Sequence, residues 1–282
     1  MIFRRKTPKP TFTPVLHRKG KRTIIFQLEK RHKFVIGIII LSVTLFISEF
    51  QFGKSGVVIA IILALLTDAI LYWAVKDDLK ENFSPSIFIL PFFYTLAFVL
   101  FYFLIPTRLL FQLSLTTLYA FGLYSLFLSE NIFIVSSIRT IALLSGARIV
   151  SFVLTLVSYF FLANIIFSLH QTIFVTIPLL ALITYPLSFQ SLWTYNLQKL
   201  PLPMKEWAGV ITVCIIQIAT LVWFWPSSPT VIALFLAGFF YTMIGMSHVW
   251  FEKKLFRNVM WEYVWVAVIV FFLLLLFTSW GK

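Results

Sequence analysis

Asp68 is the acidic residue that lies deepest within an apolar stretch of this 282-residue sequence. If the stretch that starts near Ser55 is a helix with a rise of about 1.5 Å per residue, Asp68 lies about 20 Å along it. A carboxylate at that depth in a membrane is costly unless it is paired, protonated or hydrated. Arg148, at the start of a later apolar stretch, is the expected partner, and Arg139 is a second candidate cation. Such a pair would either orient two helices or form an ion or proton site.

Motifs for other chemistry are missing from the sequence. It contains no HExxH zinc motif, no Walker lysine and no serine–histidine pair in a glycine-rich context. Asp77 and Asp78 belong to one acidic loop without a second acidic cluster. Cys214 is the one cysteine, so no disulfide and no cysteine-based metal site are available. We therefore predict no catalytic residue, no metal ligand and no cofactor.

The composition excludes most classes of soluble protein. Hydrophobic residues make up 60% of the chain and charged residues 12%, whereas an ordinary soluble domain is about 25% charged. With 33 phenylalanines and a mean hydropathy of +0.96, the chain cannot cover a water-facing surface. These values exclude a soluble enzyme, a disordered chain and a disulfide scaffold, and they indicate a helical membrane protein that crosses the bilayer many times.

Apolar stretches predict the number of crossings, because a span needs about 20 mostly apolar residues. The sequence predicts an all-α bundle of about nine transmembrane spans within residues 34–282. These spans lie at about 34–52, 55–75, 87–105, 109–128, 149–168, 172–190, 207–225, 229–249 and 262–280. The eighth span carries Ala233, Ala237, Gly238 and Gly245, a set of small residues that predicts close packing against another helix.

The segment 131–147 is apolar enough to be a tenth span, but Arg139 would lie at its centre. A central arginine costs about 2.5–3.5 kcal/mol on insertion scales. The segment has amphipathic spacing, so we expect a helix lying in the interface. With nine spans, most lysines and arginines fall on the side of the N-terminus. The positive-inside rule then places the N-terminus inside and the C-terminus outside.

Residues 1–33 form a basic tail, for which we expect disorder in the cytoplasm. The stretch TIIFQLEKRHKF at its end could form a short interfacial helix just before the first span. The tail should contact anionic lipid headgroups of the cytoplasmic leaflet, through Arg18, Lys19, Lys21, Arg22, Lys30, Arg31 and Lys33. It lacks a recognisable nucleic-acid module, so we do not expect nucleic acid as a partner.

One segment carries a resemblance to other proteins. ENIFIVSSIRTIALLSGARIVSF (130–152), which follows a block of four spans, resembles a pattern in uncharacterised bacterial multi-pass membrane families with no assigned activity. The resemblance implies a protein of the plasma (inner) membrane of a bacterium, and it implies nothing about chemistry.

Three functions remain open from the sequence. A non-enzymatic scaffold, assembly or accessory protein, in contact with other membrane proteins, comes first because intramembrane polar residues are few. An ion or small-solute transporter that uses Asp68 is the first alternative. An enzyme that acts on lipid through the acids near Asp77 is the second. A polar cavity at mid-depth of the membrane would favour the transporter. A cavity open to the inner leaflet, with two or more convergent titratable groups, would favour the enzyme.

Overall fold

The computed structural model describes residues 20–51, 56–79, 84–104, 109–136, 143–195, 197 and 202–278. Over these residues the chain forms nine α-helices, one short 3₁₀-helix and no strand. The helices are α1 (Gly20–Gln51), α2 (Gly56–Leu79), α3 (Ile89–Leu104), α4 (Leu109–Ser136), α5 (Leu144–Ser168), α6 (Ile173–Trp193), α7 (Leu202–Trp223), α8 (Pro229–Phe251) and α9 (Arg257–Leu276), with the 3₁₀-helix η1 at Pro85–Phe88. All nine are long and apolar enough to cross a membrane. The predicted all-α bundle of nine spans is confirmed, while the side on which each terminus lies stays a prediction.

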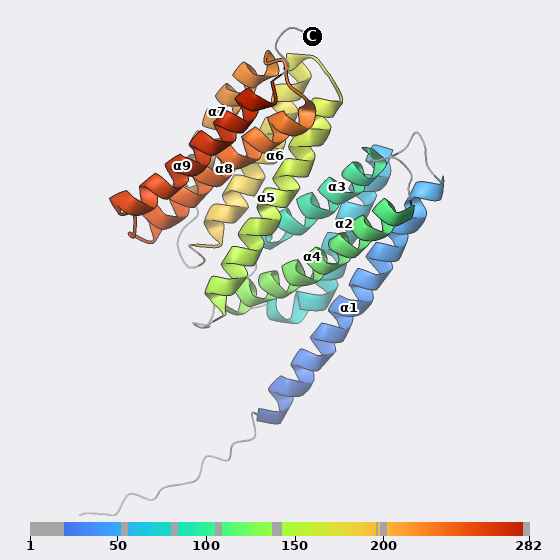
Figure 1. Cartoon of the computed structure of the whole chain (residues 1–282). Coiled ribbons are helices and arrows are strands. Elements are labelled where there is room, and N and C mark those ends of the chain that lie inside the picture. The colour runs from blue at the N-terminus through green and yellow to red at the C-terminus, as the bar shows by residue number, and fades with distance from the viewer. Residues whose placement is uncertain are drawn as a thin grey trace, which may run out of the picture.

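Successive helices run in opposite directions, so the bundle has two ends (Figure 1). We call the end at which α1 begins the tail end; α4, α6 and α8 finish there. The other is the opposite end. In Figure 1, α1–α4 gather on one side of the molecule and α5–α9 on the other. Contacts of α3 and α4 with α5, and of α3 with α6, join the two groups.

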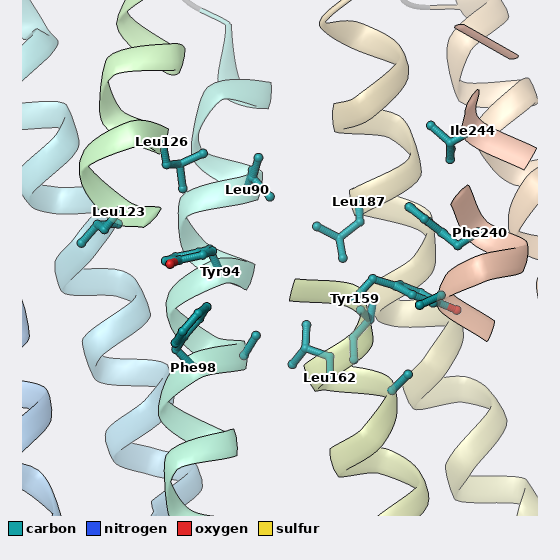
Figure 2. Close-up of a cluster of buried hydrophobic side chains, with 14 of the residues drawn as sticks. Leu90, Tyr94, Phe98, Leu123, Leu126, Tyr159, Leu162, Leu187, Phe240 and Ile244 are labelled. Atoms are coloured by element: carbon teal, nitrogen blue, oxygen red, sulfur yellow. The ribbon is translucent and has the colours of Figure 1, made fainter. Parts of the chain in front are cut away.

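Aromatic side chains fill the interior of both groups (Figure 2). In the first group, the rings of Tyr94 on α3 and Tyr119 on α4 stack with centroids 5.8 Å apart. In the second, Tyr159 on α5 stacks on Phe240 of α8 at 4.4 Å. Each of these four side chains is fully or almost fully buried. Helix association inside a membrane depends on such packing, since lipid removes most of the hydrophobic driving force.

Within the described residues, both ends of the segment 131–147 belong to neighbouring spans and not to the separate helix that we predict from its sequence. Residues 131–136 continue α4, and residues 144–147 form the first turn of α5. Phe133 is buried and packs edge-on against Trp193, with ring centroids 6.3 Å apart. This apolar packing stabilises the part of α4 that lies beyond residue 128, the predicted end of the fourth span. Arg139 lies outside the described residues, and a position in the membrane interface stays a prediction.

The end of the basic tail is also helical. Helix α1 begins at Gly20 and runs without a break to Gln51, so the stretch expected to form a short helix continues directly into the first span. The ammonium of Lys33 lies 5.2 Å from the centre of the Trp73 ring on α2, a cation–π contact. Residues 1–19 lie outside the described residues, and lipid contact by the tail stays a prediction.

The small residues of α8 do pack closely against a neighbouring helix. A Cβ placed on Gly238 would lie 2.6 Å from the side chain of Val270 on α9. One on Gly245 would overlap the ring of Tyr263, also on α9. The predicted close contact of the eighth span is thus confirmed at its two glycines, Gly238 and Gly245, where the partner is α9.

Candidate functional site

A second buried acid joins the two groups of helices. Glu130, in α4, is fully buried, and its Oε1 accepts a hydrogen bond of 3.0 Å from Nε2 of Gln190 in α6. Asp68 lies near the middle of α2, a helix that is in contact with α4. We call Asp68, Glu130 and Gln190 the carboxyl cluster.

Three oxygens of the carboxyl cluster lack a hydrogen-bond donor. Oδ1 of Asp68, Oε2 of Glu130 and Oε1 of Gln190 are all buried and have no partner among the residues that the structure describes. Gln190 is itself fully buried. Buried polar atoms normally have a partner, because leaving one unpaired costs about 1–3 kcal/mol. The cluster can therefore accept a proton or another cation.

A hydrogen-bond network fixes the turn of α2 that carries Asp68. The hydroxyl of Thr95 on α3 donates to that of Thr67 on α2 at 3.0 Å and lies 3.3 Å from the hydroxyl of Tyr119 on α4. All three side chains are fully buried. Since Thr67 directly precedes Asp68, the network fixes the position of the turn that carries the acid.

The predicted pair of Asp68 with Arg148 is not formed within the described chain. Nε of Arg148 instead donates to the carbonyl of Thr194 at 3.0 Å, and a terminal nitrogen donates to that of Tyr195 at 3.4 Å. These carbonyls directly follow the last turn of α6, where a helix leaves carbonyls without donors and carries partial negative charge. The pairing prediction was wrong because a helix end at the same level offered the guanidinium several acceptors.

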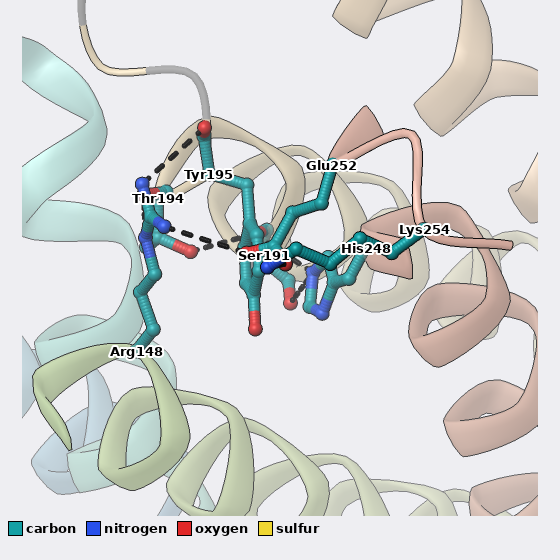
Figure 3. Close-up of polar contacts among 7 residues, drawn as sticks. All are labelled: Arg148, Ser191, Thr194, Tyr195, His248, Glu252 and Lys254. Carbon is teal, nitrogen blue, oxygen red and sulfur yellow. Dashed lines mark hydrogen bonds and ion pairs between the residues drawn. The ribbon is translucent and has the colours of Figure 1, made fainter. Parts of the chain in front are cut away.

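Arg148 is the centre of a polar group at the tail end, the Arg148 cluster, shown in Figure 3. A terminal nitrogen of Arg148 lies 3.7 Å from Oε1 of Glu252, which also pairs with Lys254 at 3.0 Å. The guanidinium lies 4.7 Å from the ring centre of Tyr195, whose ring stacks on that of His248 at 3.8 Å. Burial raises the pKa of Tyr195; Glu252 adds to the rise and Arg148 opposes it. These contacts fasten the ends of α5, α6 and α8 to one another.

Ser191 and His248 lie close together, but their geometry does not suit nucleophilic catalysis. Nε2 of His248 lies 3.2 Å from the hydroxyl of Ser191 and 3.1 Å from its carbonyl oxygen. In the tautomer that carries its hydrogen on Nε2, this nitrogen donates to the carbonyl, which only accepts, and is unable to take the hydroxyl proton as a general base. His248 is only 4% exposed. The contact is best described as a link between α6 and α8.

Glu130 is the residue that sequence reasoning missed. The predicted fourth span ends at about residue 128, which leaves Glu130 outside it, whereas α4 continues to Ser136. The apolar residues Phe133 and Ile134, both buried, were the signal that the helix continues. The side chains of Asp77 and Asp78 lie outside the described side chains, as do those of Arg18, Lys19, Lys21, Arg22 and Lys30.

No group of three or more histidine, cysteine or acidic side chains that could hold a metal ion occurs in the described part of the chain.

Comparison with known proteins identifies the family of the chain. No curated protein and no solved structure matches the chain. A family described as "Protein of unknown function (DUF5656)" matches residues 36–277, a range that includes all nine spans except the beginning of α1. This agrees with the predicted resemblance to an uncharacterised family, and the chain therefore belongs to the DUF5656 family.

Proposed function

We propose that this membrane protein transports an ion or a small solute and that the carboxyl cluster binds a cation, either a proton or a small alkali-metal ion. The observation that carries the proposal is the pair of acids, Asp68 and Glu130, with buried oxygens that no described cation or donor contacts. Ionisable side chains inside membrane spans are costly, and they commonly mark the path of an ion.

The position of the cluster supports this function. Glu130 belongs to the group α1–α4 and Gln190 to the group α5–α9, and a hydrogen bond joins them. Many transporters bind their ion between two helical units that move relative to each other. A cation bound by Glu130 and Gln190 would stabilise the arrangement in which the two groups are in contact, so its binding would be coupled to the relative position of the groups.

A scaffold role loses part of its support through Glu130. That role rests on the small number of intramembrane polar residues and on missing motifs, and the described structure adds Glu130 and Gln190 to the buried polar residues. An enzyme acting on lipid would use the acids near Asp77, whose side chains lie outside the described ones, so no observation favours it. We further propose the plasma (inner) membrane of a bacterium as the location, with the tail end in the cytoplasm.

The experiment is cation binding and flux with the purified protein in liposomes. Proton movement is followed with an enclosed pH dye and sodium movement with ²²Na⁺, each under an imposed gradient. We expect the wild type to take up one of the two cations and Glu130→Gln and Asp68→Asn to abolish that uptake. Glu206→Gln is the matched control, because Glu206 is exposed in the first turns of α7, and it should behave as the wild type does.

Two results would overturn the proposal. In the first, the wild type moves neither cation, and its thermal stability changes with pH and with sodium no differently from that of Glu130→Gln. The other is uptake that Glu130→Gln leaves intact while the protein stays folded. Either result would return the carboxyl cluster to a structural role and make the scaffold the better description.

A further inference from the structure

A cavity at the opposite end of the bundle is separate from both polar clusters. Its volume is about 250 Å³, and it lies between the turn that joins α5 to α6 and the link that joins α7 to α8. We call it the aromatic pocket. The side chains that matter for its chemistry are Phe167, Gln171, Thr176, Trp223, Trp225 and Ser227.

The walls of the aromatic pocket are held by hydrogen bonds. Trp225 donates from its indole nitrogen to the hydroxyl of Thr278 at 2.7 Å, and its backbone nitrogen donates to the carbonyl of Val222 at 2.9 Å. On the other wall, the hydroxyl of Thr176 donates to the carbonyl of Gln171 at 3.3 Å. The pocket is thus formed before any ligand arrives, as is usual for small-molecule sites.

The lining has no strong charge. The described residues that line it include no aspartate, glutamate, lysine or arginine, and the one ionisable side chain among them is His170. Nδ1 of that histidine lies 2.8 Å from the carbonyl of Ser168. A charged ligand would lose its hydration here without gaining a counter-charge, which is unfavourable. The pocket therefore suits a neutral ligand.

The remaining chemistry combines flat apolar walls with a few polar edges. Trp223, Trp225 and Phe167 supply ring surfaces, which favour contact with flat apolar groups. The hydroxyl oxygen of Ser227 is buried and has no hydrogen-bond partner in the described structure. A ligand hydroxyl would supply the missing partner once the Ser227 side chain turns toward the pocket. Thr176 and Gln171 extend the polar edge.

We infer that the aromatic pocket binds a single neutral hydroxylated ring, of the size of one sugar, stacked on the indole of Trp223 with a hydroxyl on Ser227. Such a ring has apolar faces and a hydroxylated edge, as the lining does. A volume of about 250 Å³ is slightly below the usual range of drug-sized sites, about 300–1,000 Å³, so it admits one ring and no longer chain. The inference is independent of cation binding by the carboxyl cluster.

The test is saturation-transfer NMR with methyl β-D-glucoside and the full-length protein in phosphatidylcholine nanodiscs free of sugar detergents. We expect transfer to the ring protons at millimolar glucoside, a loss of transfer in Trp223→Leu and a several-fold weaker affinity in Ser227→Ala. Trp261→Leu is the control, since Trp261 is an exposed tryptophan near the start of α9, at the tail end. Thermal unfolding of each variant establishes that it is folded.

A second experiment distinguishes a free sugar from a lipid headgroup, since both could supply the neutral hydroxylated ring. A monoglucosyl lipid added to the nanodiscs should displace the glucoside at a few molar percent if the natural ligand is a headgroup, and should leave it bound if the ligand is a free sugar. Absence of glucoside binding to the wild type, transfer that both pocket variants retain, or tighter binding of tetramethylammonium than of glucoside would overturn the inference.

Discussion

Glu130 and Gln190 show how a single hydrogen bond can connect two groups of helices. Their bond of 3.0 Å is fully buried, so neither group can exchange its partner for water. Hydrogen bonds between membrane helices contribute about 0.6 kcal/mol on average and up to about 1.7 kcal/mol. We expect the Glu130–Gln190 bond to contribute about 1 kcal/mol, within that range.

A double-mutant cycle measures this contact. We expect Glu130→Met and Gln190→Met each to lower the free energy of unfolding, and the double variant to lose about 1 kcal/mol less than the sum of the two. The measurement is unfolding in mixed micelles with increasing SDS. Additive effects, within about 0.3 kcal/mol, would mean that the two side chains do not stabilise each other.

Arg148 gives a second prediction at the scale of single residues. Arg148→Met removes the donor from two carbonyls at the end of α6 and leaves Glu252 without that partner. Hydrogen bonds to charged groups contribute about 1.5–3 kcal/mol, so a loss of about 2 kcal/mol is expected in the same unfolding assay. Arg148→Lys should recover part of the loss, because it keeps the charge but not the planar fork of donors.

The control for Arg148 lies in the same cluster. The side chain of Lys254 is 69% exposed and also pairs with Glu252. Exposed ion pairs contribute little, so Lys254→Met should change the free energy of unfolding by less than about 0.5 kcal/mol. Equal effects at the two positions would contradict a structural role of the Arg148 cluster.

The choice of partner at these residues could not be predicted from the sequence. Asp68 and Arg148 are both visible there as polar residues in or beside apolar stretches, and pairing them was a reasonable expectation. The acceptors that Arg148 contacts are backbone carbonyls of Thr194 and Tyr195, which become available only because α6 ends at that level. Such geometry depends on how three helices are placed relative to one another, and no single stretch of sequence contains it.

At the scale of elements, hydropathy predicted which residues form helices but not where each helix ends. The nine spans are confirmed because about 20 apolar residues in a row have few alternatives to a membrane helix. The end of α4 was misplaced because Ser129, Glu130 and Asn131 interrupt the apolar stretch. Two of them are buried inside the protein, so their polarity marks an internal contact and not the membrane surface.

The contact of α8 with α9 depends on a glycine. Gly238→Ala places a Cβ at 2.6 Å from Val270, closer than atoms can approach, so α9 must shift. We expect a lower midpoint of thermal unfolding, even though alanine is a better helix former than glycine by about 1 kcal/mol.

Gly209→Ala is the matched control for this substitution. Gly209 also lies within a helix, α7, and nothing lies within 4 Å of the position its Cβ would take. Its midpoint should stay the same or rise. A higher midpoint for Gly238→Ala than for Gly209→Ala would show that α8 and α9 do not approach closely at this glycine.

At the scale of the whole molecule, the nine spans lead to a prediction of orientation. An odd number of crossings puts the two termini on different sides, and the basic residues favour the cytoplasm for the tail end. A reporter that works only outside the cytoplasm should be active after Lys282, whereas the same reporter inserted between α8 and α9 should be inactive. Activity at the second position and not at the first would reverse the orientation.

Helix α9 differs from the others in how little of it is enclosed. Leu274 is its one buried residue among those described, and its extensive contacts are with α8. During synthesis it is also the last of the nine helices to leave the ribosome. The eight earlier helices can therefore complete their packing, including the bond between Glu130 and Gln190, while α9 is still being translated. A chain that stops after α8 should consequently assemble the carboxyl cluster, which would make α9 a late addition to a bundle that is already folded.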